Sequence, residues 1–139
     1  TIDFAGHLLE SLSVLVVDDE QVVREGMRAL LESLGCRVTT ADSSDTAIDV
    51  AIAQKPDLAL VDLRLRNHDD GLLTIRRLRD LYPGLPAIVI SGDTAPDRLQ
   101  SIKAADIPVL IKPVLLGPLQ EALIRSCSRA VLDQPVCPT

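Results

Sequence analysis

The chain alternates between short apolar runs and longer segments in which apolar residues recur at helical spacing. Runs rich in β-branched residues occupy residues 14–17, 57–61, 87–90 and 107–111, and each stops at a polar residue. Apolar runs of this length without polar alternation are typical of strands buried on both faces of a sheet. Residues 37–41 form a further short strand, so the sequence predicts five strands.

Each predicted strand is followed by a segment with the apolar periodicity of an amphipathic helix. Gly35 stands where a C-terminal cap belongs, and Pro118 suits the N-terminal end of the last helix. Ser43 or Ser44 caps the second helix, and Thr94 caps a short fourth helix. The apolar positions of the five helices are Val23, Met27, Leu30, Leu31 and Leu34; Ala47, Ile48, Ala51 and Ile52; Leu72, Ile75, Leu78 and Leu81; Leu99 and Ile102; and Leu119, Leu123, Cys127 and Val131.

Five strands that alternate with five helices predict the α/β class, with helices on both faces of a parallel sheet. The expected architecture is a flavodoxin-like, doubly wound (βα)5 fold with strand order 2-1-3-4-5. We place a single domain at residues 12–132. Residues 1–11 are expected to be a linker or an N-terminal extension, and residues 133–139 a disordered tail with two prolines and no periodicity.

Composition limits the partners of this domain. Of 139 residues, 47% are apolar, which suffices for a buried core, and the formal net charge is −6. One Phe, one Tyr and no Trp leave no aromatic platform on which bases could stack. Because the acidic balance also repels phosphate backbones, we expect no direct nucleic-acid partner.

The cysteines and the first residue indicate the setting of the chain. Cys36, Cys127 and Cys137 are far apart and lack Cys-x-x-Cys spacing, which argues against a disulfide framework or zinc knuckle and favours a reducing cytoplasm. No run approaches the roughly 18 apolar residues of a membrane span, so we expect no membrane segment in this fragment. The sequence begins with Thr1 and not with Met, and we interpret it as a piece of a longer chain.

Polar side chains stand at the ends of four predicted strands. Ligands of an open parallel sheet bind beyond the carboxyl ends of its strands, and in the proposed order these four strands are neighbours. The side chains that we expect to converge there are Asp18, Asp19, Asp62, Ser91 and Lys112.

This set of side chains suits a divalent cation and phosphoryl chemistry. Three crowded carboxylates repel one another, and Mg²⁺, a hard cation that prefers oxygen ligands, relieves the repulsion; Mn²⁺ is an alternative. A carboxylate beside such an ion can attack a phosphoryl group and form an acyl phosphate. The ion and Lys112 would neutralise charge on the transferring oxygens.

A series of motifs, in order along the chain, resembles the receiver domain of two-component signalling proteins over residues 11–129. Each motif alone is weak, but together, on the matching strand ends, they are specific. They are the acidic pair Asp18-Asp19, Asp62 within residues 60–65, the step Ser91-Gly92, and Lys112-Pro113 followed by Leu119.

The resemblance implies a metal site built around the phosphoacceptor. In that family pattern Asp62 accepts the phosphoryl group and is also a metal ligand. Asp19 would bind Mg²⁺ directly, Asp18 would hold it through water, and the Arg64 backbone carbonyl would be a further ligand.

The same resemblance assigns roles to the residues on the last two strands. Ser91 would be the switch hydroxyl and Lys112 the partner of the phosphoryl group, with a cis peptide bond between Lys112 and Pro113. The position three before the lysine, usually an aromatic switch residue in the family, is Val109. The aromatic coupling of the family is therefore absent here.

Three positions near the acceptor are expected to modulate the site. Gly92 follows the switch serine, while Arg64 and Asp93 carry opposite charges and are expected to pair across the mouth of the site, where they would hinder the water that hydrolyses the acyl phosphate. Eight residues separate Asp62 from Gly71, one more than in the common family pattern.

The loop at residues 63–66, the run at residues 92–96 and the valine after Lys112-Pro113 look most like receivers at the C-terminus of hybrid sensor histidine kinases. The resemblance implies a cytoplasmic, bacterial phosphoacceptor that receives its phosphoryl group from a sensor histidine kinase or a histidine phosphotransfer domain. It would be no enzyme beyond assisting its own phosphorylation and dephosphorylation. A homodimer through the face of helix 4, strand 5 and helix 5 is an option.

Two other functions stay open. A Mg²⁺-dependent phosphohydrolase with an aspartyl phosphate intermediate would use the same carboxylates, although the adjacent pair Asp18-Asp19 lacks the Asp-x-Asp spacing of haloacid-dehalogenase-like phosphatases and no cap segment is available. A receiver that has lost its switch would serve as a docking module. Beryllofluoride with Mg²⁺ separates a switch from a docking module, because only the switch should respond around Ser91 and Lys112.

Overall fold

The computed structural model describes residues 12–65, 70–92, 100 and 107–133. Its strands form one sheet in which all neighbours pair in parallel, in the order β2-β1-β3-β4-β5. The predicted flavodoxin-like fold and its strand order are thereby confirmed. The strands are β1 (Ser13–Val17), β2 (Arg37–Ala41), β3 (Leu58–Asp62), β4 (Ala87–Ser91) and β5 (Val109–Ile111).

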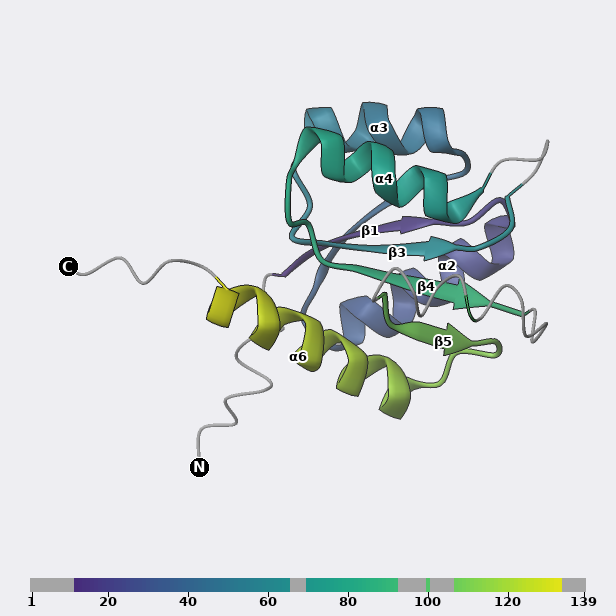
Figure 1. The fold of residues 1–139 in the computed structure, drawn as a ribbon. Coiled ribbons are helices and arrows are strands. Elements are labelled where there is room, and N and C mark those ends of the chain that lie inside the picture. Colours follow the sequence, from purple (N-terminus) through teal and green to yellow (C-terminus); the bar gives the residue numbers. More distant parts are fainter. Residues whose placement is uncertain (1–11, 66–69, 93–99, 101–106, 134–139) are drawn as a thin grey trace.

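Helices cover both faces of the sheet, as a doubly wound fold requires (Figure 1). The described helices are α2 (Gln21–Ser33), α3 (Ser44–Ala53), α4 (Gly71–Leu81) and α6 (Leu116–Asp133). Helices α3 and α4 lie on one face, and α2 and α6 lie on the other. The predicted short helix with Leu99 and Ile102 falls outside the described residues, as do the predicted extensions at residues 1–11 and 134–139.

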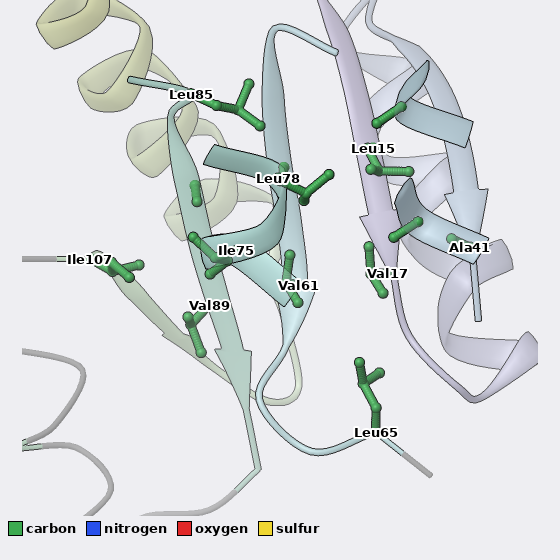
Figure 2. Close-up of a cluster of buried hydrophobic side chains, with 14 of the residues drawn as sticks. Leu15, Val17, Ala41, Val61, Leu65, Ile75, Leu78, Leu85, Val89 and Ile107 are labelled. Carbon is green, nitrogen blue, oxygen red and sulfur yellow. The ribbon is translucent and has the colours of Figure 1, made fainter. Parts of the chain in front are cut away.

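Two hydrophobic cores result because successive side chains of a strand point to opposite faces. On β1, Leu15 and Val17 belong to the core beneath α3 and α4, while Val14 and Val16 belong to the core over α2 and α6. Strands β3 and β4 divide their side chains in the same way. Figure 2 shows the first core, in which Leu65 lies just beyond the end of β3. Burial on both faces explains why these strands read as unbroken apolar runs.

Several element boundaries differ from the sequence expectation by one or two residues, and those of β5 and α6 have a clear local cause. Strand β5 begins at Val109 and not at residue 107, because Pro108 has no N–H to donate to the ladder, although its carbonyl still accepts from the Val89 N–H at 2.9 Å. Helix α6 begins at Leu116 and not at Pro118, which therefore stands inside the first turn, where its missing N–H has no intrahelical partner to lose. The helix also includes Asp133, which the sequence pattern assigns to the tail.

The helix ends follow the expected capping chemistry. Ser43, and not Ser44, is the N-cap of α3, and its hydroxyl accepts from the Thr46 N–H. Asp70 caps α4 in the same manner, and Gly35 adopts φ 91° after α2, a conformation that favours glycine. Among the described residues, no helix combines the length and the apolar character that a membrane crossing requires.

Candidate functional site

Three charged side chains from three strands meet at the carboxyl edge of the sheet. Asp18 directly follows β1, Asp62 ends β3, and Lys112 directly follows β5. The Lys112 Nζ lies 3.0 Å from the Asp62 Oδ2 and 3.5 Å from the Asp18 Oδ2. The parallel sheet thus brings together groups that are 94 residues apart in sequence (112 − 18 = 94), as the strand-end pattern predicts.

Both carboxylates are removed from water, which changes their electrostatics. Asp18 is 1% exposed and Asp62 is 5% exposed. Burial raises the pKa of Asp62, and the nearby Asp18 charge raises it further, although the hydrogen bond from Lys112 opposes both. For Lys112, burial alone lowers the pKa, but the two carboxylates outweigh it and the net pKa is raised. The lysine is therefore held as a cation between two acids.

The turn between β1 and α2 carries three consecutive acids and is fixed by Asp18. The Asp18 Oδ1 accepts from the Glu20 N–H at 2.9 Å, and the Asp18 carbonyl accepts from Arg24 Nη1 at 2.7 Å. One carboxylate oxygen from each of Asp18, Asp19 and Glu20 lies within 4.8 Å of the others. Glu20 is the N-cap residue of α2 but makes no side-chain capping bond, so its carboxylate is not used to close the helix.

Hydrogen bonds join the two ends of the segment between β3 and α4. The Arg64 N–H donates to the Asp62 Oδ1 at 3.3 Å, and Arg64 forms an isolated antiparallel bridge with Asp70. The Gly71 N–H donates to the Leu63 carbonyl at 2.9 Å. The start and the end of this loop therefore lie side by side, while residues 66–69, which hold most of the unusual loop sequence, fall outside the described residues.

A cavity of about 420 Å³ opens at this edge of the sheet. Ser91 is buried at the end of β4, and its carbonyl accepts from the Lys112 N–H at 2.9 Å. The peptide bond between Lys112 and Pro113 is cis, as the resemblance implies. The cavity is lined by Asp19, Glu20, Asp62, Arg64, Leu65, Ser91, Gly92 and Lys112.

The donor set of this cavity fits a hard divalent cation. It offers the carboxylates of Asp19 and Glu20, which follow β1, and of Asp62 at the end of β3. Asp18 does not line the cavity, but its Oδ2 is a buried oxygen that accepts no hydrogen bond and lies 3.5 Å from the Lys112 ammonium. Oxygen-rich sites of partly hydrated, carboxylate character are those that Mg²⁺ prefers. Because Asp62 lies in the same cavity, a cation bound there would be next to this carboxylate.

Two residues of this edge escaped the sequence analysis. Glu20 lines the cavity, and its position directly after the acidic pair was a signal that could have been used. Arg24 lies between the apolar positions of α2, and its guanidinium donates to the backbone carbonyl of Asp18. The spacing of residues in the sequence does not predict the contact between Arg24 and Asp18, because it depends on the angle between β1 and α2.

The expected modulating positions are placed only in part. Arg64 is exposed at the cavity, and Gly92 lies there with room to spare, since an added Cβ would first meet the Lys112 Cδ at 3.8 Å. Val109 is half-buried and packs on the core under α3 and α4. Asp93, and with it the predicted pair with Arg64, lies outside the described residues.

A family model described as the response regulator receiver domain matches residues 14–124. The KDP operon transcriptional regulatory protein KdpE of Escherichia coli is 37% identical over 112 residues, which cover 80% of this chain and 49% of KdpE. The probable transcriptional regulatory protein TcrX of Mycobacterium tuberculosis is 34% identical, over 75% of this chain and 44% of TcrX. The chain thus spans about half the length of these curated relatives.

Solved structures show the same fold. The signal receiver domain of a modulated diguanylate cyclase from Desulfovibrio desulfuricans superposes with a TM-score of 0.80 at 30% identity, over 90% of this chain and 100% of that one. A response regulator receiver domain protein from Clostridium thermocellum gives a TM-score of 0.79 at 25% identity, over 88% and 99% of the two chains. The expectation of no nucleic-acid partner is not supported, since two relatives are named as transcriptional regulatory proteins.

Proposed function

The chain belongs to the response regulator receiver domain family, and we propose that it accepts a phosphoryl group from a phosphohistidine on the carboxylate of Asp62. The observation that carries this proposal is the buried contact of the Asp62 Oδ2 with Lys112 beside an open, acid-lined cavity. The donor would be a sensor histidine kinase or a histidine phosphotransfer domain.

Asp62, Lys112 and Ser91 would each have a separate role in the phosphoryl transfer. An oxygen of Asp62 forms the new bond to phosphorus while the bond from phosphorus to the donor imidazole breaks, and the imidazole leaves with that electron pair. Lys112, already 3.0 Å from this carboxylate, places a positive charge where negative charge develops on the phosphoryl oxygens. The buried Ser91 hydroxyl, at the end of the neighbouring strand, would then donate to a phosphoryl oxygen.

We assign the metal site to Asp18, Asp19, Asp62 and the Arg64 carbonyl, with Mg²⁺ as the expected ion and Mn²⁺ as its substitute. When bound, the ion supplies further neutralisation of the phosphoryl oxygens. Arg24 supports the site through the Asp18 backbone, which it holds at 2.7 Å.

A phosphohydrolase and a docking module are the weaker candidates. The position two after Asp62 is Arg64 and not the acid that such phosphatases carry there, and the family is one of signalling domains. A docking module would not require a lysine held between two buried carboxylates. A location in a bacterial cytoplasm accords with the bacterial source of the relatives.

The finer hypothesis of a hybrid histidine kinase receiver stays a prediction. It rests on the loop sequences at residues 63–66 and 92–96, whereas the relatives described above are named as transcriptional regulatory proteins. The homodimer through the face that includes β5 also stays a prediction, since the helix that would precede β5 lies outside the described residues.

Replacement of Asp62 by Asn tests the proposal directly. The amide keeps the size of the side chain but is a poor nucleophile, so we expect phosphoryl uptake from acetyl phosphate with Mg²⁺ to be abolished. Asp49→Asn, an exposed position on α3, is the matched control and should be phosphorylated like the parent. Intact mass spectrometry reads both variants, and a phosphoryl adduct that persists in Asp62→Asn would assign the acceptor elsewhere.

A further inference from the structure

Gly71 lies against the backbone of the proposed phosphoacceptor. It is the first residue of α4, it is buried, and its N–H donates to the Leu63 carbonyl at 2.9 Å. A Cβ on Gly71 would stand 2.2 Å from the Asp62 carbonyl oxygen, 2.9 Å from the Asp62 carbonyl carbon and 3.0 Å from the Leu63 Cα. All three are main-chain atoms, which cannot rotate away as a flexible side chain can.

Glycine is required at position 71 because a side chain would not fit, and not because of an unusual backbone conformation. The described glycines with a positive φ are Gly35 and Gly84, and Gly71 is not among them, so its backbone conformation is open to any L-residue. Non-bonded heavy atoms rest at about 3.5 Å. A side chain at this position would therefore force roughly 1 Å of movement, shared between the start of α4 and the end of β3.

The end of β3 has little freedom to move without moving the carboxylate. The Asp62 side chain is held at two points, by the Arg64 N–H at Oδ1 and by Lys112 at Oδ2, and these come from different strands or loops. A displaced Asp62 backbone would carry its carboxylate away from Lys112, because β4 lies between β3 and β5 and no strand pairing ties Lys112 to β3 directly.

We propose that Gly71 is a positioning residue for phosphoryl transfer: by lacking a side chain it leaves room for the Asp62 main chain and so sets the distance between the Asp62 carboxylate and Lys112. This inference rests on the proposed function of Asp62. In-line transfer depends on alignment to within fractions of an ångström, and a misplacement of about 1 Å can cost on the order of 100-fold in rate.

The test compares Gly71→Ala with Gly26→Ala, which is a matched control because an added Cβ at Gly26, in α2, meets nothing within 4 Å. Phosphorylation by acetyl phosphate with Mg²⁺ is followed over a range of donor concentrations, at a temperature where circular dichroism shows folded protein. We expect the maximal rate of Gly71→Ala to fall about 100-fold while the half-saturating donor concentration changes little, because the charges that line the cavity are kept. Gly26→Ala should behave as the parent does.

A second readout separates positioning from a loss of stability. The side-chain ammonium resonance of ¹⁵N-labelled Lys112 reports its hydrogen bond to Asp62 in the metal-free protein, and we expect this resonance to shift in Gly71→Ala only. A Gly71→Ala protein with a lower melting temperature, but with the parent's rate and ammonium resonance, would overturn the proposal.

If Gly71→Ala is unfolded in buffer, trimethylamine N-oxide, which favours compact states, is added to it and to the parent, and both rates are measured there. A variant that remains unfolded in the osmolyte would also overturn the proposal, since glycine would then be needed for folding itself. Failure of the parent to take up phosphoryl would instead refute the proposed function, so the two failures are distinguishable.

Discussion

Strands β3 and β5 carry the two partners of the central ion pair, but they are built differently. Strand β3 has five residues, all buried, and pairs with β1 on one side and β4 on the other. Strand β5 has three residues, none buried, and pairs with β4 alone, at the edge of the sheet. Asp62 thus ends the more constrained strand and Lys112 follows the less constrained one.

This difference suggests which side of the site can adjust. The side chain of Asp62 taken alone is 7% exposed and stands at the end of an interior strand, whereas the Lys112 side chain is 26% exposed and reaches it from the edge strand. Elements with few buried apolar contacts open at lower free energy than the core does. We therefore expect a change of state at this site to move β5 and Lys112 while β3 stays in place.

The largest change in the free energy of unfolding should come from truncating a leucine side chain on each of the two strands. Leu60 on β3 is fully buried, and Leu60→Ala should lower the free energy of unfolding by about 3 kcal/mol. Leu110 on β5 is half-buried, and Leu110→Ala should cost only about 1 kcal/mol, since less apolar area is lost. Urea denaturation measures both variants, and equal losses would show that the edge strand is as firmly packed as the interior one.

The strands could be predicted from the sequence because both faces of the sheet are covered, whereas their order was taken from the flavodoxin-like type of doubly wound fold. An unbroken apolar run such as Val14–Val17 is buried on both faces only as a strand inside the sheet. Because the strands are parallel, the polar residue that follows each run lies at the carboxyl edge of the sheet. Asp62 and Lys112 were found for this reason. The contacts of Arg24 with Asp18 and of Gly71 with Asp62 could not be found, because they depend on how each helix leaves its turn.

A smaller change in the free energy of unfolding is expected from removing the negative charge of Asp62 at the end of β3. Two buried carboxylates share one ammonium there, and burial raises the pKa of Asp62. The folded state therefore keeps the Asp62 proton to a higher pH than the unfolded chain does. Between the ordinary carboxyl pKa and this raised pKa, the folded state binds more protons, so stability falls as the pH rises through this interval.

Asp62→Asn removes this cost, so the metal-free variant should be more stable than the parent at pH 7, by on the order of 1 kcal/mol. The gain should shrink as the pH falls from the raised pKa of Asp62 toward about 4 and should be absent below that, where the carboxyl is protonated in both states. Thermal melts with a chelator across this pH range make the measurement, and the exposed Asp49→Asn should show no such gain. A variant less stable than the parent at pH 7 would mean that the ion pair with Lys112 outweighs the burial of Asp62.

The smallest change in the free energy of unfolding is expected from substituting Val109, at the position where the family usually carries an aromatic residue. Val109 is half-buried on β5, and its partner in the neighbouring strand, Val89, is fully buried. Because β5 is the edge strand and Val109 is only half-buried, Val109→Tyr should change the free energy of unfolding by less than about 1 kcal/mol. Val89→Tyr overfills the core between β4 and α4 and should cost about 1 to 3 kcal/mol. Val109 does not line the cavity, so phosphoryl uptake from acetyl phosphate should also be unchanged in Val109→Tyr. If Val109→Tyr destabilises as much as Val89→Tyr in urea denaturation, β5 is packed as an interior strand and the adjustable edge must be sought elsewhere.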